Sequence, residues 1–171
     1  MSSKNQTTKS STKKSAKSSS SSINKISYPI IILIGIVFYY YCSEFNFVQD
    51  DSYITYRYVK NFTEGNGLVF NIGERVEGYT CFLWVVLLSF IKLIGINFIL
   101  FSQYSGIIFS ILTLFFVYKI SSTVFLKNKN EYYNLTMSLA AVVLTASNGA
   151  YAYWSISGME TGMFTFLITL A

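Results

Sequence analysis

The sequence predicts an all-α integral membrane protein, and three features point to that fold class. Of the 171 residues, 52% are apolar and only 12% are charged, a balance that excludes a soluble or disordered chain as a description of the whole. Apolar runs of the length needed for membrane-spanning helices recur along the sequence. The one proline, Pro29, leaves little irregular linker between these runs.

The charges are distributed unevenly, and this distribution limits the function. Histidine is absent, which excludes histidine metal sites and histidine acid–base catalysis. The net charge is +5, yet the residues after position 25 carry seven basic and eight acidic side chains, so no basic face for nucleic acid is expected. The other six basic residues all precede position 26: Lys4, Lys9, Lys13, Lys14, Lys17 and Lys25.

The two cysteines, Cys42 and Cys81, are too few for a four-thiolate zinc site or a disulfide framework. They flank a segment that we expect outside the cytoplasm, where a bridge between them is one interpretation. The other interpretation is two small apolar side chains, which we favour. The sequence therefore predicts no metal site built by the protein alone.

Residues 1–25 are expected to form a disordered, Ser/Lys-rich cytoplasmic tail, because this composition cannot bury enough apolar surface to fold. The first predicted span, residues 26–43, follows directly. It lacks the cleavage site of a signal peptide and carries Tyr39, Tyr40 and Tyr41 near its end, so we interpret it as a retained anchor. The lysines before it place the N-terminus in the cytoplasm.

Three more spans are predicted, at residues 98–120, 135–152 and 163–171. The last is truncated at an apolar end, which favours the N-terminal portion of a longer chain. All acidic residues except Glu131 then fall outside the cytoplasm, so any chemistry is expected on that side.

The apolar run at residues 81–96 decides this topology. As a helix it reaches about 24 Å, less than the hydrocarbon core of about 30 Å, and Lys92 lies within it. If it spans, Lys127 and Lys129 fall outside the cytoplasm. We favour an interfacial helix within one long extracytoplasmic loop, residues 44–97, because the next span then carries those lysines to the cytoplasmic side.

Residues 48–65 in this loop are predicted to form a helix, entered through acidic residues and ended by Gly65. Two faces are expected. One is apolar, with Ile54, Tyr58 and Phe62 at four-residue spacing. The other brings together Asp50, Tyr53 and Arg57. A carboxylate and a guanidinium on one face are suited to deprotonate a hydroxyl and to hold a phosphate, although an acidic first turn is also ordinary helix electrostatics.

Residues 67–78 suggest a small β-hairpin, with an apolar triplet, an Asn/Gly turn and a charged return. The hairpin would bring Arg75 and Glu77 back toward the membrane, unless Arg75 only pairs with Glu74 or Glu77 as an exposed ion pair. The sequon at Asn61 lies on the predicted outer side and is expected to be the one that a lumenal host could glycosylate.

Two segments carry a resemblance to a known family. The run DDSYITYRYVKNFTEGNGLVFNIGERVEGYTCFLW, residues 50–84, resembles the signature of a polytopic bacterial family related to the mycobacterial terminal arabinofuranosyltransferases, within the GT-C glycosyltransferases. The run YWSISGMET, residues 153–161, resembles its second signature. Two positions depart from the family pattern: Ile72 replaces a common Pro, and Cys81 replaces Asn or Ser.

The resemblance implies a GT-C-like transmembrane bundle, of which this chain is the N-terminal part, and transfer of a sugar from a polyprenyl-phosphate donor to an acceptor hydroxyl on a glycan or lipid. It implies that Asp50 is the base and that Asp51 orients the acceptor or helps to bind a divalent cation, Mg or Mn. Candidate substrate-binding residues are Arg57 and Arg75 for the donor phosphate, with Glu77 and Glu160.

Two questions stay open, namely whether the chain is catalytic and which membrane it occupies. A multi-pass scaffold or assembly subunit without catalytic activity would have the same spans, and the 171 residues alone are short for a complete enzyme. The membrane is either a bacterial plasma membrane or that of the endoplasmic reticulum.

Overall fold

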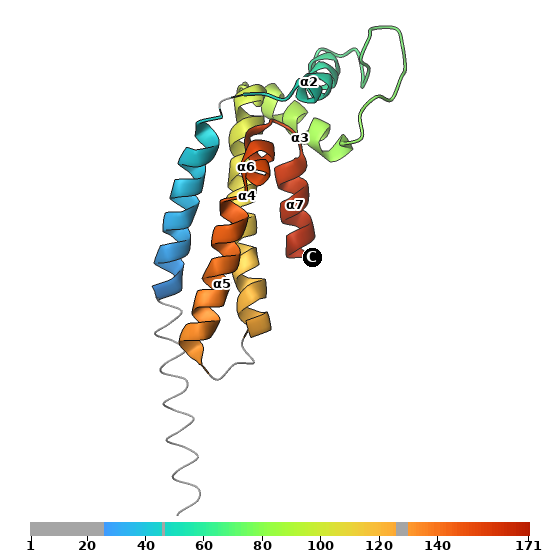
Figure 1. The fold of residues 1–171 in the computed structure, drawn as a ribbon. Coiled ribbons are helices and arrows are strands. Elements are labelled where there is room, and N and C mark those ends of the chain that lie inside the picture. The colour runs from blue at the N-terminus through green and yellow to red at the C-terminus, as the bar shows by residue number, and fades with distance from the viewer. Residues whose placement is uncertain (1–25, 46, 126–129) are drawn as a thin grey trace, which may run out of the picture.

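A computed structural model of the chain describes residues 26–45, 47–125 and 130–171, and within them all regular structure is helical. Seven helices are present, which confirms the predicted fold class (Figure 1). They are Ile26–Ser43, α2 (Asp50–Thr63), α3 (Phe82–Leu93), α4 (Phe98–Phe125), α5 (Glu131–Ala146), α6 (Gly149–Ile156) and α7 (Thr161–Leu170). The predicted tail, Lys127 and Lys129 lie outside the described residues.

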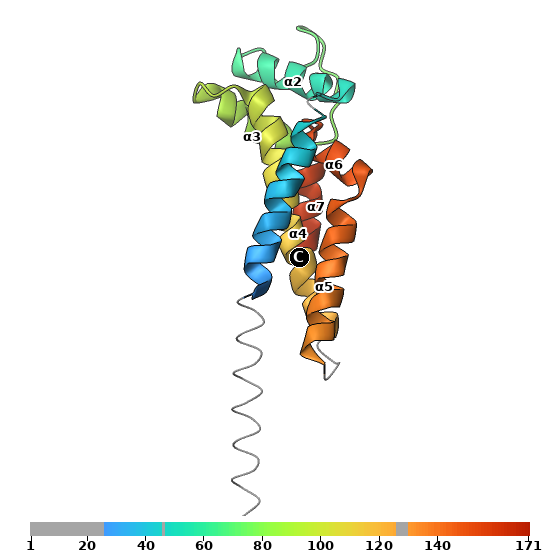
Figure 2. The same ribbon diagram turned by 60° about the vertical axis from the view of Figure 1, so that its left-hand side comes forward.

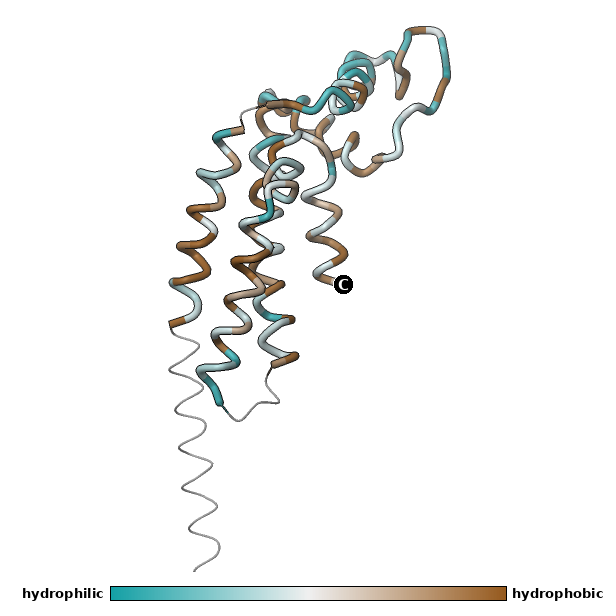
Figure 3. Tube along the Cα trace, viewed as in Figure 1, coloured by the Kyte–Doolittle hydropathy of each residue, from teal (hydrophilic) through white to brown (hydrophobic). Residues whose placement is uncertain are grey.

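Two helices are long and apolar enough to cross a membrane, namely Ile26–Ser43 with 18 residues and α4 with 28. A third candidate is the pair formed by α5 and α6, which is bent by 59° at a short break. The chain is therefore an integral membrane protein with two or three candidate spans. Apolar residues dominate these helices in Figure 3, whereas the loop between α2 and α3 is mixed.

The break between α5 and α6 divides the predicted span 135–152. It has a local cause, because the Asn148 side chain accepts a hydrogen bond from the Tyr151 amide and so caps a new helix. The last predicted span, 163–171, corresponds to α7, an apolar helix of 10 residues.

Helices α2 and α3 lie together across one end of the bundle (Figures 1 and 2). Helix α4 runs from that end to the other, α5 returns, and the α6–α7 turn, residues 157–160, lies at the same end as α2 and α3. The two predicted outer segments, 44–97 and the turn after α6, thus share one end, as the predicted topology requires. Which side of the membrane this end faces stays a prediction.

Helix α3 lies within the predicted interfacial segment 81–96 and is four residues shorter. One of its faces is buried against α2 and α4, with Trp84 and Leu88 fully enclosed. The opposite face leaves Phe82, Phe90 and Leu93 more than half exposed. A 12-residue helix with an uncovered apolar side is suited to lie along a lipid surface, which stays a prediction for α3.

Helix α4 is the centre of the bundle and packs against α3, α5, α6 and α7. Glycine lets these helices approach closely. A Cβ atom at Gly162 of α7 would lie 2.6 Å from the Gly106 carbonyl oxygen of α4, and one at Gly106 would collide with the Ser155 carbonyl oxygen of α6. The side chain of Ser155 also donates a hydrogen bond of 2.7 Å to Ser110 Oγ of α4.

The opposite end of the bundle carries a cation. Lys119 Nζ donates to Tyr28 Oη at 3.2 Å and lies over the Tyr28 and Phe115 rings, 5.5 Å and 5.4 Å from their centroids. Tyrosine and lysine near a helix end are typical of a membrane interface. Lys119 therefore lies at the same end of the bundle as the start of the first helix.

Candidate functional site

Helix α2 begins at Asp50, two residues after the start of the predicted helix 48–65, with Asp50 and Asp51 in its first turn. It ends at Thr63, and Gly65 follows with a φ of 85°. Of the predicted apolar side, Tyr58 is buried, whereas Ile54 and Phe62 are exposed. The buried face is mixed instead: Ser52, Thr55, Tyr56, Tyr58, Val59 and Asn61.

This polar composition has a physical reason, because buried side chains of α2 bind the main chain of other segments. Ser52 Oγ donates to the Ser157 carbonyl at 2.9 Å, and Tyr58 Oη donates to the Val76 carbonyl at 2.8 Å. A buried polar group is tolerated when it is hydrogen-bonded. Apolar spacing alone therefore does not indicate which face of α2 is buried.

The acidic residues and Arg57 occupy the exposed side of α2. Asp50, Asp51, Tyr53 and Arg57 are all exposed, which agrees with the predicted second face. The described residues do not bury the two carboxylates. Arg57 Nε donates to the Phe70 carbonyl at 3.1 Å, which leaves the terminal nitrogens of its guanidinium for another acceptor.

The predicted hairpin at residues 67–78 is wrong: the segment is an irregular loop without strand pairing. Besides two turn bonds of its own, its main chain bonds to α2, since the Val69 and Phe70 carbonyls both accept from Asn61 Nδ2, at 2.8 and 2.9 Å. An isolated two-stranded hairpin is marginal in water, so the contacts with α2 decide the conformation.

The same loop brings Arg75 and Glu77 together around a hollow of about 390 Å³. Within the described residues neither Arg57 nor Arg75 forms an ion pair with a carboxylate, so the alternative pairing of Arg75 with Glu74 or Glu77 is not seen. The hollow is lined by Asn66, Gly67, Leu68, Val69, Arg75, Val76, Glu77 and Tyr79.

The α6–α7 turn packs directly on the start of α2. The main-chain N–H of Gln49 donates to the Ser157 carbonyl at 2.9 Å, and Tyr153 Oη donates to Gln49 Oε1 at 2.7 Å. On the α3 side, Trp84 Nε1 donates to the Gly158 carbonyl at 3.1 Å. Both segments that carried the family resemblance, 50–84 and 153–161, therefore meet in one place.

Glu160, the last predicted site residue, lies on this turn beside Cys81, whose thiol is 3.4 Å from Thr55 Oγ1. Burial raises the pKa of Cys81, the Thr55 hydroxyl lowers it, and the Glu160 carboxylate raises it by charge and as a hydrogen-bond partner. Asp51 is one turn before Thr55 on the same side of α2. Both cysteines are free, which favours the interpretation without a bridge.

Replacing Glu160 with Gln should lower the pKa of Cys81, because it removes a negative charge that disfavours the thiolate. We therefore expect faster alkylation of Cys81 at a fixed pH of about 8, and a rate profile displaced to lower pH. The measurement is maleimide modification in a Cys42→Ala background. Glu77→Gln is the matched control and should leave the alkylation rate unchanged. Equal rates in Glu160→Gln and in the Cys42→Ala background would mean that the Glu160 carboxylate does not act on the Cys81 thiol.

Asn61 has a structural role in this site. It is 2% exposed, and its amide nitrogen donates to the carbonyls of Val69 and Phe70. That Asn61 is the sequon open to a lumenal host stays a prediction, and a glycan there would have to replace these two bonds.

Asn61→Ala should lower the free energy of unfolding by about 2 kcal/mol, since the two hydrogen bonds of a buried side chain are lost at about 1 kcal/mol each. The Phe70 carbonyl keeps the bond from Arg57 Nε. Thermal unfolding in detergent gives the loss, and proteolysis between residues 66 and 80 should accelerate. The exposed Asn71→Ala, which removes only a bond to Glu74, is the control. A loop that resists protease equally in both variants would contradict the role of Asn61.

A metal held by the protein alone does not fit the side chains present. Across residues 26–45, 47–125 and 130–171, no three His, Cys, Asp or Glu side chains gather closely enough to hold an ion. The exposed Asp50 and Asp51 are two donors without a third, and a Mg or Mn site on carboxylates normally needs more oxygen ligands. The role of Asp51 is therefore derived without a metal.

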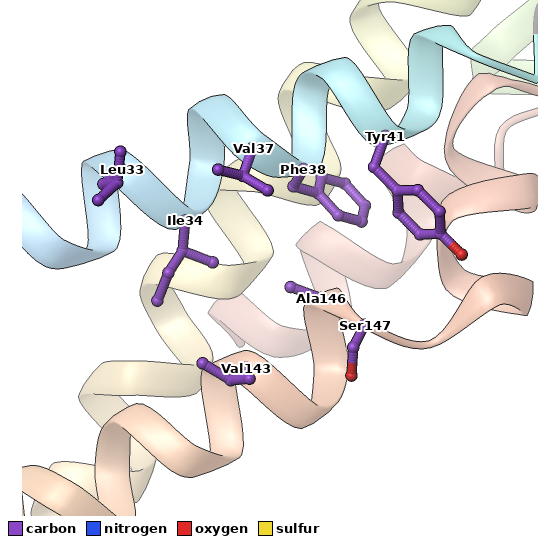
Figure 4. Close-up of a pocket in the computed structure, with 8 residues that line it drawn as sticks. All are labelled: Leu33, Ile34, Val37, Phe38, Tyr41, Val143, Ala146 and Ser147. Carbon is purple, nitrogen blue, oxygen red and sulfur yellow. The ribbon is translucent and has the colours of Figure 1, made fainter.

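An apolar groove of about 490 Å³ lies between the first helix and α5 (Figure 4). Its walls include Leu33, Val37, Phe38 and Val143, and the hydroxyls of Tyr41 and Ser147 lie at one end. Such a groove is shaped for a hydrocarbon chain.

Aromatic contacts connect the hydroxyl end of this groove with the start of α2. The ring centroids of Tyr41 and Phe45 are 5.5 Å apart, those of Phe45 and Tyr153 are 6.4 Å apart, and Tyr153 binds Gln49. The groove thus opens toward the end of the bundle that carries Asp50.

Comparisons with known proteins give one partial similarity. A stretch of 47 residues, 28% of this chain, is 45% identical to a terminal beta-(1->2)-arabinofuranosyltransferase from Corynebacterium glutamicum. The matched stretch spans only 7% of that protein's length. No family model matches the chain. No solved structure matches it either.

Proposed function

We propose that the chain forms the acceptor-activating part of a membrane glycosyltransferase, which transfers a sugar from a polyprenyl-phosphate donor to an acceptor hydroxyl on the extracytoplasmic side. One observation carries the proposal: the segment 153–161 lies on the first turn of α2, so two stretches resembling one enzyme family build one site. The 45% identity to an arabinofuranosyltransferase over 47 residues supports the same reaction class.

In this proposal Asp50 is the general base. It is the first residue of α2, exposed, and held by its neighbour Gln49 at a fixed place. Its carboxylate takes the proton of the acceptor hydroxyl while the oxygen attacks the anomeric carbon of the donor. The bond from that carbon to the phosphate oxygen breaks, and the electron pair leaves with the polyprenyl phosphate. Asp51, next to it, orients the acceptor.

Arg57 and Arg75 are the proposed cations for the donor phosphate. Both are exposed, and neither pairs with a carboxylate in the described part of the chain. A guanidinium that is not neutralised can stabilise charge on a leaving phosphate. Arg57 is the more ordered of the two, because its Nε is fixed on the Phe70 carbonyl. Glu77, beside the hollow with Arg75, and Glu160, beside Cys81, are proposed to contact sugar hydroxyls.

The donor's hydrocarbon chain is assigned to the groove between the first helix and α5. That groove is lined almost wholly by apolar side chains, and its hydroxyl end lies toward α2. A lipid-linked donor bound there has its chain between spanning helices and its phosphate near the bundle end that carries the acidic turn. This arrangement also requires residues 44–97 to face away from the cytoplasm.

The test is transfer of a labelled sugar from a polyprenyl-phosphate donor in membranes that contain the protein as the cell makes it. Transfer that depends on Asp50 supports the proposal. Absence of transfer from any polyprenyl-phosphate sugar, with correct membrane insertion, supports a scaffold or assembly subunit instead. Cysteine labelling at position 51 from the outside only would support the proposed orientation, and labelling from the inside only would contradict it.

A further inference from the structure

We propose that the α6–α7 turn positions the acidic first turn of α2, with Ser52 and Gly158 as positioning residues. This inference rests on the proposed transferase function, because the turn would set where Asp50 meets an acceptor hydroxyl. Its evidence is a set of contacts between segments about one hundred residues apart in the chain, beginning with the bond between Ser52 and Ser157, 105 residues apart.

The Ser157 carbonyl is the first element of this contact. It accepts two hydrogen bonds of 2.9 Å, from the main-chain N–H of Gln49 and from Ser52 Oγ. Ser52 is 1% exposed and Ser157 is fully buried, so water does not compete for the carbonyl. The first N–H groups of a helix have no acceptor within it, and Gln49 makes no side-chain cap. The start of α2 is therefore anchored from outside the helix.

The Gln49 side chain is the second element. Tyr153 Oη donates to Gln49 Oε1 at 2.7 Å, and the Tyr153 ring stacks on Phe47 with centroids 4.2 Å apart. The main chain and the side chain of Gln49 are thus both bound by the segment 153–157. Because Asp50 directly follows Gln49, its direction depends on these two bonds.

Gly158 is the third element, since it lets the turn approach α2. Its φ is +84°, and a Cβ there would collide with Tyr56 Oη and lie 3.4 Å from Ser52 Oγ. Its carbonyl accepts the bond from Trp84 Nε1 of α3. Glycine alone combines this backbone conformation with this close approach. The turn is consequently fixed between α2 and α3 and has no room to shift without moving α2.

The positional readout of the test is independent of activity. A spin label at position 50, in Asp50→Cys with Cys81→Ser, reports the mobility of the first turn of α2. We expect the double change Ser52→Ala and Tyr153→Phe to raise label mobility clearly. Ser89→Ala is the matched control, because Ser89 is equally buried but donates only within its own helix, to the Val85 carbonyl at 2.7 Å.

The kinetic readout uses the protein with Asp50 intact. Ser52→Ala with Tyr153→Phe should lower kcat by about 10- to 100-fold, the cost of a displacement of about 1 Å. KM should be nearly unchanged, and the unfolding temperature should fall only modestly, because two hydrogen bonds are lost. Gly158→Ala should lower kcat as well. Adding Tyr56→Phe removes the hydroxyl that meets the new Cβ, so this second change should restore part of the lost rate.

The outcomes separate this inference from the function on which it rests. Unchanged label mobility in the Ser52/Tyr153 variant overturns the positioning role, whatever the enzyme does. Raised mobility with an unaltered kcat in an active protein overturns it also. Raised mobility in a chain that transfers no sugar even with the natural residues keeps the turn as the anchor of α2 and rejects the transferase.

Discussion

Asp50→Ala is expected to reduce sugar transfer by about 10²- to 10⁴-fold, the usual contribution of a general base, while the protein still inserts and folds. The structural cost should be small because the side chain is exposed and α2 keeps Asp51 in its acidic first turn. The measurement is kcat for transfer from a polyprenyl-phosphate donor, with insertion checked by protease protection. Asp50→Asn should be similarly inactive, since an amide has nearly the same shape but cannot accept the proton.

The matched control is Glu74→Gln, which neutralises an exposed carboxylate of the same outer segment. It should retain most of the activity. Asp51→Asn should be intermediate and should raise KM for the acceptor more than it lowers kcat, because its proposed role is orientation. Transfer at the natural rate in Asp50→Ala would remove the base from the mechanism and, with it, the functional assignment of the first turn of α2.

Alanine at both Gly106 and Gly162 is expected to lower the free energy of unfolding by about 3 kcal/mol. Alanine favours a helix over glycine by about 1 kcal/mol, but overpacking a close contact costs about 1–3 kcal/mol per site. Here the opposing atoms are main-chain carbonyl groups, of Ser155 and Gly106, which cannot rotate away. The two substitutions share one contact between α4 and α7, so their effects should not add fully.

The control for these variants is Gly149→Ala at the start of α6. A Cβ there meets only Tyr41 Oη, at an ordinary 3.5 Å, so stability should be unchanged or slightly higher. Thermal unfolding in detergent compares the Gly106/Gly162 variant, Gly149→Ala and the natural chain. Equal stability of the Gly106/Gly162 variant and the natural chain would mean that α7 does not rest on α4 as described.

Much of the fold follows from local features of the sequence. Apolar run length predicted helices at 26–43 and 98–120, and the acidic entry with Gly65 predicted a helix at 48–65, two residues longer at each end than α2. These features depend on residues close together in the chain, and each has a direct physical cause, transfer into lipid or capping of a helix end. The second span was predicted to end at residue 120, five residues before the end of α4. Lys119 lies within the helix and donates to the Tyr28 hydroxyl, so this charge does not end the helix.

The candidate site was less predictable, because local patterns do not show which side chains bind main-chain carbonyls. The hairpin at 67–78 was wrong, since Asn61 binds the carbonyls of that loop instead. Ser52 turns inward to a carbonyl 105 residues away in the chain. A polar residue at a buried helix position gives no signal of its own. The second signature segment offered the clue, because a glycine within it, Gly158, has a left-handed backbone conformation.

The sequence by itself determined that this protein is a helical membrane protein with an acidic helix between its first two long apolar helices. Hydrophobicity and capping act over a few residues and need no knowledge of packing. Only the tertiary structure decided that the α6–α7 turn rests on that helix, that Glu160 meets Cys81, and that the loop after α2 bonds to Asn61. Those contacts depend on how helices far apart in the chain align, which close glycine contacts and shared carbonyl acceptors fix only once the bundle has formed.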